Sequence, residues 1–474
     1  MKRVPSWLVI AVTLAAAAAP LAGQSAPTVA APTAAPLAPA PAYHDVLPGY
    51  GRPVDVAATR ARRQRLMDRL GDAVVLIPAA TERDIEGVDY PQDNDFRQHN
   101  AFFYYTMLET ARAWLLLEAR TDGPDAEVLL LPPRRPDRER WTGVRLGPGA
   151  EAVELSGIAR VDSVGNLDAL LAAARSRRVP LYVPVDRTTD NDTLVRRLRA
   201  DTAAGPIRNL RPLLDSLRAV KDAAELEALR RAIVLSANAH ADLMRGARAG
   251  MFEYELEAIF EASARRQGAD RLGYPSIVGS GFNATTLHYD VNRRQTRDGD
   301  LVVVDAGAEW GQYTADITRT VPVSGRFTPR QRALYDLVLG AQQAAMDSVR
   351  PGTTLLRLNQ IAMAWLRDHS GDLCPARPGE QLRGAATCDR YMIHGLSHGI
   401  GMDVHDPLPG RRPLEPGMVF TIEPGVYIPA ESLGVRIEDC VVVTATGYEL
   451  LSGNAPRRAE DVERLMAEGR RRRT

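Results

Sequence analysis

The chain has 474 residues, of which 45% are hydrophobic and 25% are charged. These proportions are typical of a globular protein and exclude a mainly disordered, collagen-like or polytopic membrane protein. The 59 basic residues balance the 59 acidic residues, so no basic surplus indicates nucleic acid as a partner. The length suggests two or three domains, and three cysteines are too few for a scaffold built from disulfides.

The first 23 residues predict a secretory signal peptide. Lys2 and Arg3 give a positive start, and the apolar stretch 7–19 that follows is shorter than the roughly 20 residues of a membrane span. Small residues after it offer a cleavage site. We therefore expect an exported protein, periplasmic or secreted, without stable membrane insertion after cleavage; the alternative is an uncleaved anchor. Residues 24–44 are rich in Ala and Pro and predict a flexible linker.

Residues 45–215 alternate between helical and strand-like patterns, which indicates an α/β domain. Apolar runs bounded by turn residues predict strands, and apolar positions at helical spacing predict helices. We expect strands at 73–78, 113–119, 127–131 and 179–185, and helices at 58–70, 167–175 and 192–198. The domain contains no glycine-rich phosphate-binding loop.

Residues 216–456 form a second predicted domain, which opens with a long helix carrying an apolar stripe. Thr328-Pro329-Arg330-Gln331 has the residues of a capping box with proline in the first turn, and it predicts the start of another helix. A further helix is expected at 355–369, and strands are expected at 300–305, 418–422 and 435–443. Residues 457–474 predict a C-terminal amphipathic helix and a solvated Arg-rich tail.

Two aspartates stand in apolar sequence, where a carboxylate is expensive to bury. Asp305 ends the apolar run 301–304, and Asp316 follows eleven residues later. Taken alone, Asp305 could be a capping or hydrogen-bonded residue. A hairpin between the two would bring their side chains together, and two buried carboxylates repel each other unless they share a proton or a cation.

Histidines cluster within residues 394–406, whose sequence is HGLSHGIGMDVHD. Three of the chain's eight histidines lie there: His394, His398 and His405. A lone histidine is usually structural, but a cluster of three is informative. The glycines between them let the backbone fold tightly around whatever the imidazoles hold.

Two glutamates complete the set of buried acids. Glu423 ends an apolar strand before a Pro-Gly turn, and Glu438 lies inside the apolar strand 435–443. With the two aspartates and one imidazole, they would place four carboxylates in a β-rich core. Because such charges oppose folding unless compensated, we expect two divalent cations. Oxygen-rich donors with one imidazole favour Mn²⁺, Co²⁺ or Fe²⁺, and a two-metal centre activates water while it polarises a carbonyl.

The second domain resembles the pita-bread-fold metallopeptidases, which include methionyl aminopeptidase, aminopeptidase P and prolidase. The five metal ligands of that family, in chain order, match without substitution: Asp305, Asp316, His398, Glu423 and Glu438. Residues 221–232, KDAAELEALRRA, are similar to the opening helix of aminopeptidase P and prolidase, and residues 93–108 resemble a segment of their N-terminal domain. Because methionyl aminopeptidases lack that domain, the resemblance implies a creatinase-like α/β N-terminal domain followed by an α+β pita-bread catalytic domain.

The resemblance also implies a role for each ligand. Asp305 would chelate one metal ion, and Asp316 and Glu438 would bridge both ions. His398 and Glu423 would complete the shell of the second ion. Glu423 would in addition move a proton to the leaving proline nitrogen.

Four further residues match accessory positions of the family. His288 and His405 would be catalytic imidazoles that hydrogen-bond the tetrahedral intermediate or move its proton. His394 and Arg436 would contact the substrate. An alternative for His394 is a packed histidine that only shapes the pocket.

The implied reaction is hydrolysis of the N-terminal Xaa-Pro bond of a peptide with proline in second position. Mn²⁺ is the favoured ion, with Co²⁺, Fe²⁺ and Zn²⁺ as alternatives. The first alternative function is a prolidase, which applies the same chemistry to dipeptides. The second is a metal-free pita-bread hydrolase or peptide-binding module, which the complete ligand set disfavours. The sequence leaves the oligomeric state open, a homo-oligomer included.

A polar segment rich in Pro and Gly, residues 368–390, precedes the histidine cluster and departs from the usual family pattern. It holds Cys374 and Cys388, which are 14 residues apart in a chain expected to be exported. We therefore predict a disulfide between them, which would hold the segment rigid at the mouth of the site. Cys440 lies in an apolar strand and is expected to be a buried free thiol.

Overall fold

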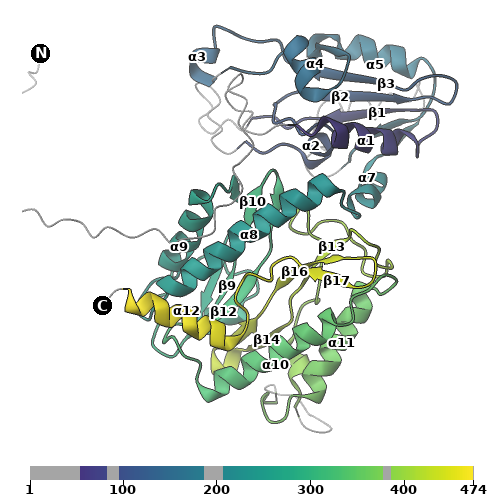
Figure 1. Ribbon diagram of the computed structural model, residues 1–474. Coiled ribbons are helices and arrows are strands. Elements are labelled where there is room, and N and C mark those ends of the chain that lie inside the picture. The colour runs from purple at the N-terminus through teal and green to yellow at the C-terminus, as the bar shows by residue number, and fades with distance from the viewer. Residues whose placement is uncertain (1–53, 83–95, 143, 186–205, 377–385, 473–474) are drawn as a thin grey trace, which may run out of the picture. The chain divides into compact units, whose positions relative to one another are not determined.

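The structure is a computed structural model, which describes residues 54–82, 96–142, 144–185, 206–376 and 386–472 (Figure 1). The predicted signal peptide, the linker and the expected helix at 192–198 lie outside the described residues. Among the helices within those ranges, none is both long enough and apolar enough to cross a bilayer.

The N-terminal part is built on a six-stranded mixed sheet with strand order β4-β3-β2-β1-β5-β6 (Figure 1). The central strand β1 pairs antiparallel with β2 and parallel with β5. The elements are α1 (Val56–Met67), β1 (Ala73–Pro78), α2 (Asn100–Thr106), β2 (Trp114–Ala119), β3 (Ala126–Leu131), α3 (Glu139–Thr142), α4 (Ala150–Ser156), β4 (Val161–Ser163), η1 (Val164–Asn166), α5 (Leu167–Arg175), β5 (Leu181–Val183), β6 (Ile207–Asn209) and α7 (Arg211–Arg218).

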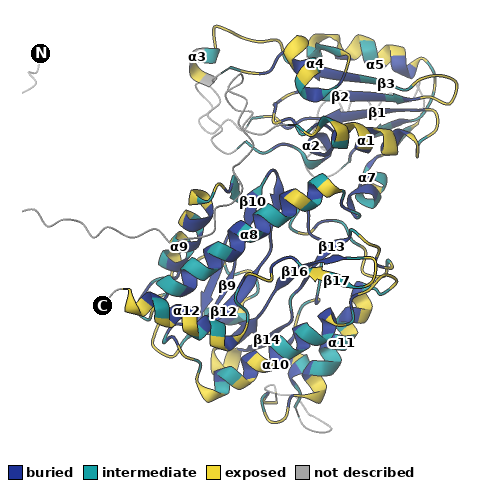
Figure 2. Cartoon of the chain, in the orientation of Figure 1, coloured by how far each residue is buried: buried dark blue, intermediate teal, exposed yellow. Residues whose placement is uncertain are grey.

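The four strands expected in this part all form, but β5 is shorter than the apolar run 179–185 suggested. Pro180 and Pro184 flank it, and a proline cannot donate a hydrogen bond to a neighbouring strand. β1 is buried on both faces (Figure 2), and its alternate residues enter two different cores. Val75 packs in the core that includes α1 and α2, whereas Val74 packs in the core that includes α5.

The C-terminal part combines small antiparallel sheets with long helices. Its sheets have strand orders β11-β10-β7, β12-β9-β8, β13-β16-β17 and β14-β15. The helices are α8 (Ala223–Gly246), α9 (Glu253–Arg266), η2 (Gly281–Thr285), α10 (Pro329–Met346), α11 (Leu355–Asp368), η3 (Cys388–Tyr391), η4 (Pro429–Glu431) and α12 (Ala459–Arg471). The strands are β7 (Arg271–Leu272), β8 (Ile277–Ser280), β9 (Leu301–Asp305), β10 (Ala308–Trp310), β11 (Tyr313–Thr314), β12 (Thr318–Pro322), β13 (Val419–Ile422), β14 (Gly425–Ile428), β15 (Leu433–Arg436), β16 (Asp439–Val443) and β17 (Tyr448–Leu450).

Two apolar cores hold these strands between helices. Val302 and Val304 of β9 pack in a core shared by α8, α9 and α12. Phe420 of β13 and Val441 of β16 pack in a second core shared by α10 and α11. Helix α10 starts with the predicted capping box, because the hydroxyl of Thr328 accepts from the backbone N–H of residue 331 and the carboxamide of that residue accepts from the N–H of Thr328.

The expected strand 435–443 is wrong as a single element. It divides into β15, which pairs with β14, and β16, which pairs with β13. On the opposite side, Glu423 and Pro424 separate β13 from β14 at the same level. The two interruptions therefore divide the pairing into β14 with β15 and β13 with β16. Glu438 therefore lies in the break between two strands and not inside one. Its backbone N–H, free of ladder pairing, donates to the carbonyl of Thr318 at 3.1 Å.

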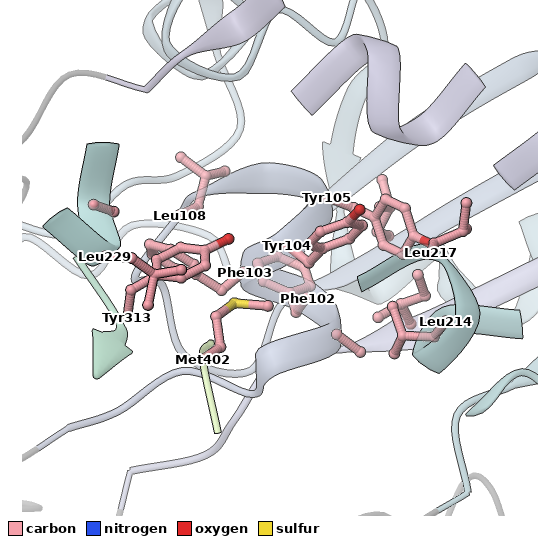
Figure 3. Close-up of a cluster of buried hydrophobic side chains, with 14 of the residues drawn as sticks. Phe102, Phe103, Tyr104, Tyr105, Leu108, Leu214, Leu217, Leu229, Tyr313 and Met402 are labelled. Atoms are coloured by element: carbon pink, nitrogen blue, oxygen red, sulfur yellow. The ribbon is translucent and has the colours of Figure 1, made fainter. Parts of the chain in front are cut away.

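Helix α2 is packed against residues from the C-terminal part (Figure 3). Its side chains Phe102, Phe103, Tyr104 and Tyr105 are all less than 5% exposed. In Figure 3 they lie in one apolar cluster with Leu229 of α8, Tyr313 of β11 and Met402 of the histidine-rich loop. Apolar burial therefore joins the N-terminal sheet to the elements that carry the predicted site.

Candidate metal centre

A hairpin brings the two predicted aspartates together. β9 ends at Asp305, the chain then makes the hairpin β10–β11, and β12 returns beside β9 with Thr318 opposite Asp305. Gly307 allows this close return, since a Cβ there would lie 2.0 Å from the carbonyl oxygen of Ala315. Asp316 stands just before β12, in a stretch that belongs to no strand. The hydroxyl of Tyr274 lies 2.6 Å from Oδ1 of each aspartate.

The two glutamates lie in two adjacent interruptions of strand pairing: Glu423 lies between β13 and β14, and Glu438 lies between β15 and β16. The backbone N–H of Glu423 donates to the carbonyl of Leu396 at 2.9 Å, which ties this break to the histidine-rich loop. Oε2 of Glu438 accepts from the hydroxyl of Thr318 at 2.8 Å. These bonds hold the backbone of Glu423 and the carboxylate of Glu438, and Oε1 of each glutamate faces Nε2 of His398.

His398 stands where these carboxylates converge. Its Nε2 lies 3.3 Å from Oε1 of Glu423, 3.4 Å from Oδ2 of Asp316 and 3.9 Å from Oε1 of Glu438. Its Nδ1 faces the carbonyl of Gly399 at 3.0 Å, which suits the tautomer with Nε2 free as a ligand. The predicted ligand residues are therefore brought together by the fold.

The donor atoms fit divalent cations. Ligand atoms of Asp316, His398 and Glu438 lie within 4.8 Å of one another, close enough to surround one ion. Asp305 and Glu423 flank this group through the contacts described above. Four carboxylates and one imidazole supply hard oxygen donors with a single nitrogen, a set that suits Mn²⁺, Co²⁺, Fe²⁺ or Zn²⁺ in a catalytic site.

The pKa shifts of the clustered acids and of His398 show that positive charge stabilises this site. Burial raises the pKa of Asp305 to about 7 and raises that of Glu438 well above its usual range. Burial disfavours the imidazolium of His398, but the hydrogen bonds and charges of Asp316 and Glu423 outweigh it and raise its pKa to about 12. Burial would also raise the pKa of Asp316, yet His398 holds it below the usual value. Protons thus offset part of the charge that cations would offset.

The other three predicted residues with imidazoles differ in exposure. His288 and His405 are exposed, and His394 is partly buried. The ring of His405 meets the ring of His398 edge-on, with 4.2 Å between centroids. Burial lowers the pKa of His405, as does the neighbouring His398, and burial lowers the pKa of His394. The imidazoles of His394 and His405 are therefore mainly neutral near pH 7.

His394 and Arg436 are joined through Tyr427, which the sequence did not single out. The phenol oxygen of Tyr427 lies 2.8 Å from Nε2 of His394 and accepts from Nη1 of Arg436 at 3.1 Å. Arg436 is buried, and its Nη2 donates to Oδ2 of Asp305 at 2.7 Å. The other ring nitrogen of His394, Nδ1, faces the carbonyl of Gly395 at 2.9 Å.

Tyr274 and Thr318 contact predicted ligands and Tyr427 contacts His394 and Arg436, but none of the three was identified from the sequence. Each is a common residue type in ordinary strand or loop sequence, and only its hydroxyl contact distinguishes it. Thr318 lies two residues after Asp316, Tyr427 lies four residues after Glu423, and Tyr274 lies far from any predicted ligand in sequence, so their positions carry no motif of their own. The one sequence signal that could have indicated Thr318 is a hydroxyl residue close to the end of a strand that carries a predicted acidic ligand.

The predicted disulfide is present between Cys374 and Cys388. The middle of the segment, residues 377–385, lies outside the described residues. Cys440 is a buried free cysteine, as predicted, and its thiol donates to the carbonyl of Asp316 at 3.0 Å. Burial raises the pKa of that thiol well above its usual value, so it stays protonated.

Comparison with known proteins places two family profiles on the chain. The profile of metallopeptidase family M24 matches residues 227–445, and that of the aminopeptidase P N-terminal domain matches residues 59–182. The Xaa-Pro aminopeptidase of Escherichia coli strain K12 is 34% identical over 440 residues, which cover 86% of this chain and 97% of that relative. The Xaa-Pro aminopeptidase of Haemophilus influenzae is 33% identical, with 85% and 96% covered.

Solved structures agree with the sequence comparison. A zinc-substituted Escherichia coli aminopeptidase P in complex with product has a TM-score of 0.78 and 32% identity, covering 88% of this chain and 99% of that one. Proline aminopeptidase P II from Yersinia pestis has a TM-score of 0.77 and 34% identity, covering 88% and 100%. The similarity thus extends over both the N-terminal sheet and the elements that carry the five donors.

Proposed function

This chain belongs to the Xaa-Pro aminopeptidases of metallopeptidase family M24, and we propose that it is an exported enzyme that holds two divalent cations, of which Mn²⁺ is favoured. Its fold is the family's α/β N-terminal domain followed by an α+β pita-bread domain. One observation carries the proposal of a dinuclear centre. Three carboxylates converge on His398, and a fourth, that of Asp305, is linked to Asp316 through the hydroxyl of Tyr274. A single divalent ion would leave part of their charge uncompensated.

The predicted roles divide the five donors between the ions. Asp305 would hold one ion, Asp316 and Glu438 would bridge, and His398 and Glu423 would hold the other. When bound, the cations supply Lewis acidity to the scissile carbonyl and to the attacking water. The M24 family and the donor set support divalent metal in general, and a zinc-substituted relative supports tolerance of more than one ion.

The chain's own residues would handle the proton and the developing charge. Glu423 would take the proton of the attacking water and pass it to the proline nitrogen as that nitrogen leaves. His288 and His405, both exposed, would donate hydrogen bonds to the oxyanion of the tetrahedral intermediate. His394 and Arg436, linked through Tyr427, would contact the substrate backbone.

A peptide panel with metal add-back tests the activity. We expect hydrolysis of the first bond in a Gly-Pro-Xaa tripeptide, slower or no hydrolysis of the Gly-Pro dipeptide, and none of a Gly-Ala-Xaa control. Chelation should abolish turnover, and Mn²⁺ should restore it better than Zn²⁺. Preference for the dipeptide would favour the prolidase alternative, and full activity after complete chelation would refute the metal-dependent proposal.

Export is tested by fractionation and N-terminal sequencing. The proposal rests on the signal-like first 23 residues, and the disulfide between Cys374 and Cys388 supports an oxidising compartment. We expect the protein in the periplasmic or secreted fraction, with an N-terminus near residue 24. An intact N-terminus in the cytoplasmic fraction would contradict this.

A further inference from the structure

A buried ion cluster lies behind the loop that carries His405. Asp406 is 4% exposed, Arg218 is 1% exposed and Lys221 is 5% exposed. The ammonium of Lys221 donates to Oδ2 of Asp406 at 2.9 Å, and the guanidinium of Arg218 donates to Oδ1 of Asp406 and, at 2.8 Å, to Asp403. We call these four residues the loop anchor. None of them is a predicted metal ligand.

The loop is folded around the carboxylate of Asp406. The backbone N–H of Asp406 donates to the carbonyl of Gly399 at 2.8 Å, and the N–H of Asp403 faces Oδ1 of Asp406 at 3.3 Å. Gly401 is required for this close approach, because a Cβ there would lie 2.6 Å from the carboxylate carbon of Asp406. The carboxylate therefore occupies the centre of a tight turn that any shift of Asp406 would open.

The turn places His405 relative to the metal site. His405 directly precedes Asp406, so its Cα is fixed at about 3.8 Å from that of Asp406. On the other side, its ring contacts the ring of His398, which stands among the carboxylates. His405 is exposed and is held from behind by Asp406, a residue anchored to two buried cations.

The anchor also ties the loop to the N-terminal part of the chain. The carboxamide of Asn100 donates to Oδ1 of Asp403 at 2.7 Å, and Arg97 donates to the carbonyl of Met402 at 2.5 Å. The side chain of Met402 lies in the apolar cluster with α2 shown in Figure 3. The loop thus has a polar and an apolar attachment outside the metal centre.

The charges of the loop anchor restrict the position of Asp406 more tightly than apolar packing would. A buried carboxylate with two cations on opposite oxygens has one arrangement that satisfies all three groups, and loss of one partner leaves a buried charge uncompensated. After the predicted signal peptide, Lys221 is the chain's single lysine. Its compact ammonium reaches one oxygen of Asp406, whereas a single nitrogen of Arg218, Nη2, donates to both Asp403 and Asp406.

We propose that Asp406, held by Lys221 and Arg218, is a positioning residue that sets His405 for catalysis. The inference rests on the proposed catalytic role of His405. Asp406→Asn keeps the shape but turns an amide N–H toward one of the two cations. We expect kcat to fall at least tenfold, because small displacements of a catalytic group are costly, while KM changes little and metal content stays unchanged.

A double-mutant cycle with His405→Ala provides the test. If Asp406 acts through His405, Asp406→Asn should lower kcat less than twofold in the His405→Ala background. The same tenfold loss in both backgrounds would overturn the inference, while leaving the role of His405 intact. If His405→Ala alone leaves kcat unchanged, the role of His405 fails and the inference fails with it, whereas the aminopeptidase activity is judged separately by the peptide panel.

Two further variants keep the test decisive. Should Asp406→Asn not fold, Asp403→Asn weakens the same anchor at a partly exposed position and should show a smaller loss of kcat that also vanishes without His405. Glu127→Gln is the matched control. It breaks the ion pair between Glu127 and the buried Arg63, 3.0 Å apart on the N-terminal sheet. It should lower the melting temperature and leave kcat unchanged in both backgrounds.

Discussion

The guanidinium of Arg436 donates to the carboxylate of Asp305 at 2.7 Å, and both side chains are buried. The same guanidinium donates to the phenol oxygen of Tyr427 at 3.1 Å and, through Nε, to the hydroxyl of Thr318 at 3.2 Å. Arg436 therefore connects a predicted ligand, a residue that orients another ligand, and the partner of His394. Contact with substrate, its predicted role, would come in addition to these bonds.

Replacement of Arg436 by Lys should lower kcat/KM by at least tenfold. An ammonium group cannot span three acceptors that the guanidinium fork reaches from different nitrogens. Asp305 would lose its charged partner, and Tyr427 would lose a donor. Steady-state kinetics on a Gly-Pro-Xaa peptide measures the effect. Arg230→Lys, at an exposed pair with Glu449, is the control and should change kcat/KM by less than twofold. Equal kinetics for both variants would contradict the connecting role of Arg436.

Removal of a predicted ligand should remove metal and activity together. Asp305→Ala and Glu438→Ala each delete a carboxylate from the cluster, so bound metal should fall from two ions to one or none per chain. Elemental analysis of the purified variants gives the stoichiometry, and the peptide assay gives turnover. Glu449→Gln, an exposed acid, serves as the control. Near-normal metal content and turnover in Asp305→Ala would refute the two-metal proposal.

The two exposed imidazoles should affect turnover without affecting metal. His288→Ala and His405→Ala should lower kcat by about 10²–10⁴, the range of general acid–base catalysis. Metal content should match the parent protein, since neither ring is placed as a ligand. His369→Ala, at the end of α11 and stacked on Trp365, is the control. Loss of metal from either variant would move that histidine into the ligand set and overturn its assignment.

The convergence of the acids was predictable because each stands where apolar sequence makes a carboxylate costly, whereas the family resemblance singled out His398 among the three clustered histidines. Asp305 and Glu423 end apolar strands, and a run of three histidines in thirteen residues is rare in a chain with eight. Local sequence could not predict the break before Asp439, because the run 435–443 contains no proline or glycine and is apolar except at Arg436 and the two acids. That break arises from a change of strand partner, which is a tertiary event.

Local sequence patterns could not predict the residues that position the site's side chains. Tyr274 and Thr318 act through single hydroxyl contacts across the fold, and neither contact leaves a periodic signal. Asp406 lay inside the quoted motif, yet its two cations are about 185 residues earlier in the chain. Such pairings depend on which surfaces the core brings together, and the sequence specifies that only through the whole set of packing interactions.

The disulfide should affect substrate choice more than metal binding. Cys374 and Cys388 close the segment before the histidine-rich loop, and the hydroxyl of Tyr391 donates to the carbonyl of Pro375 within it. Cys388→Ser should lower the melting temperature, since a loop of that size contributes about 3 kcal/mol by chain entropy. The ratio of kcat/KM between tripeptides and longer peptides should change while metal content does not. Mass mapping that finds two free thiols in the exported protein would refute the disulfide itself.

A buried glutamate distant from the metal centre should make stability depend on pH. Glu225 closes the capping box of α8 by accepting from the N–H of Asp222 at 3.0 Å, and it also accepts from the hydroxyl of Tyr313 at 3.1 Å. Burial raises the pKa of Glu225 from 4.5 to about 7, although the charge of Arg62 opposes this. The folded state therefore binds a proton that the unfolded state has released between these two values.

Because the folded state holds the extra proton, the contribution of Glu225 to stability is present below pH 4.5 and is lost as pH rises through 7. Glu225→Gln cannot ionise and still fits the capping box. The unfolding free energy of the variant relative to the parent should therefore rise by about 3 kcal/mol between pH 4.5 and pH 8. Denaturant unfolding at several pH values measures this difference, and metal effects common to both proteins cancel. A difference that stays constant with pH would show that Glu225 is ionised in the folded protein.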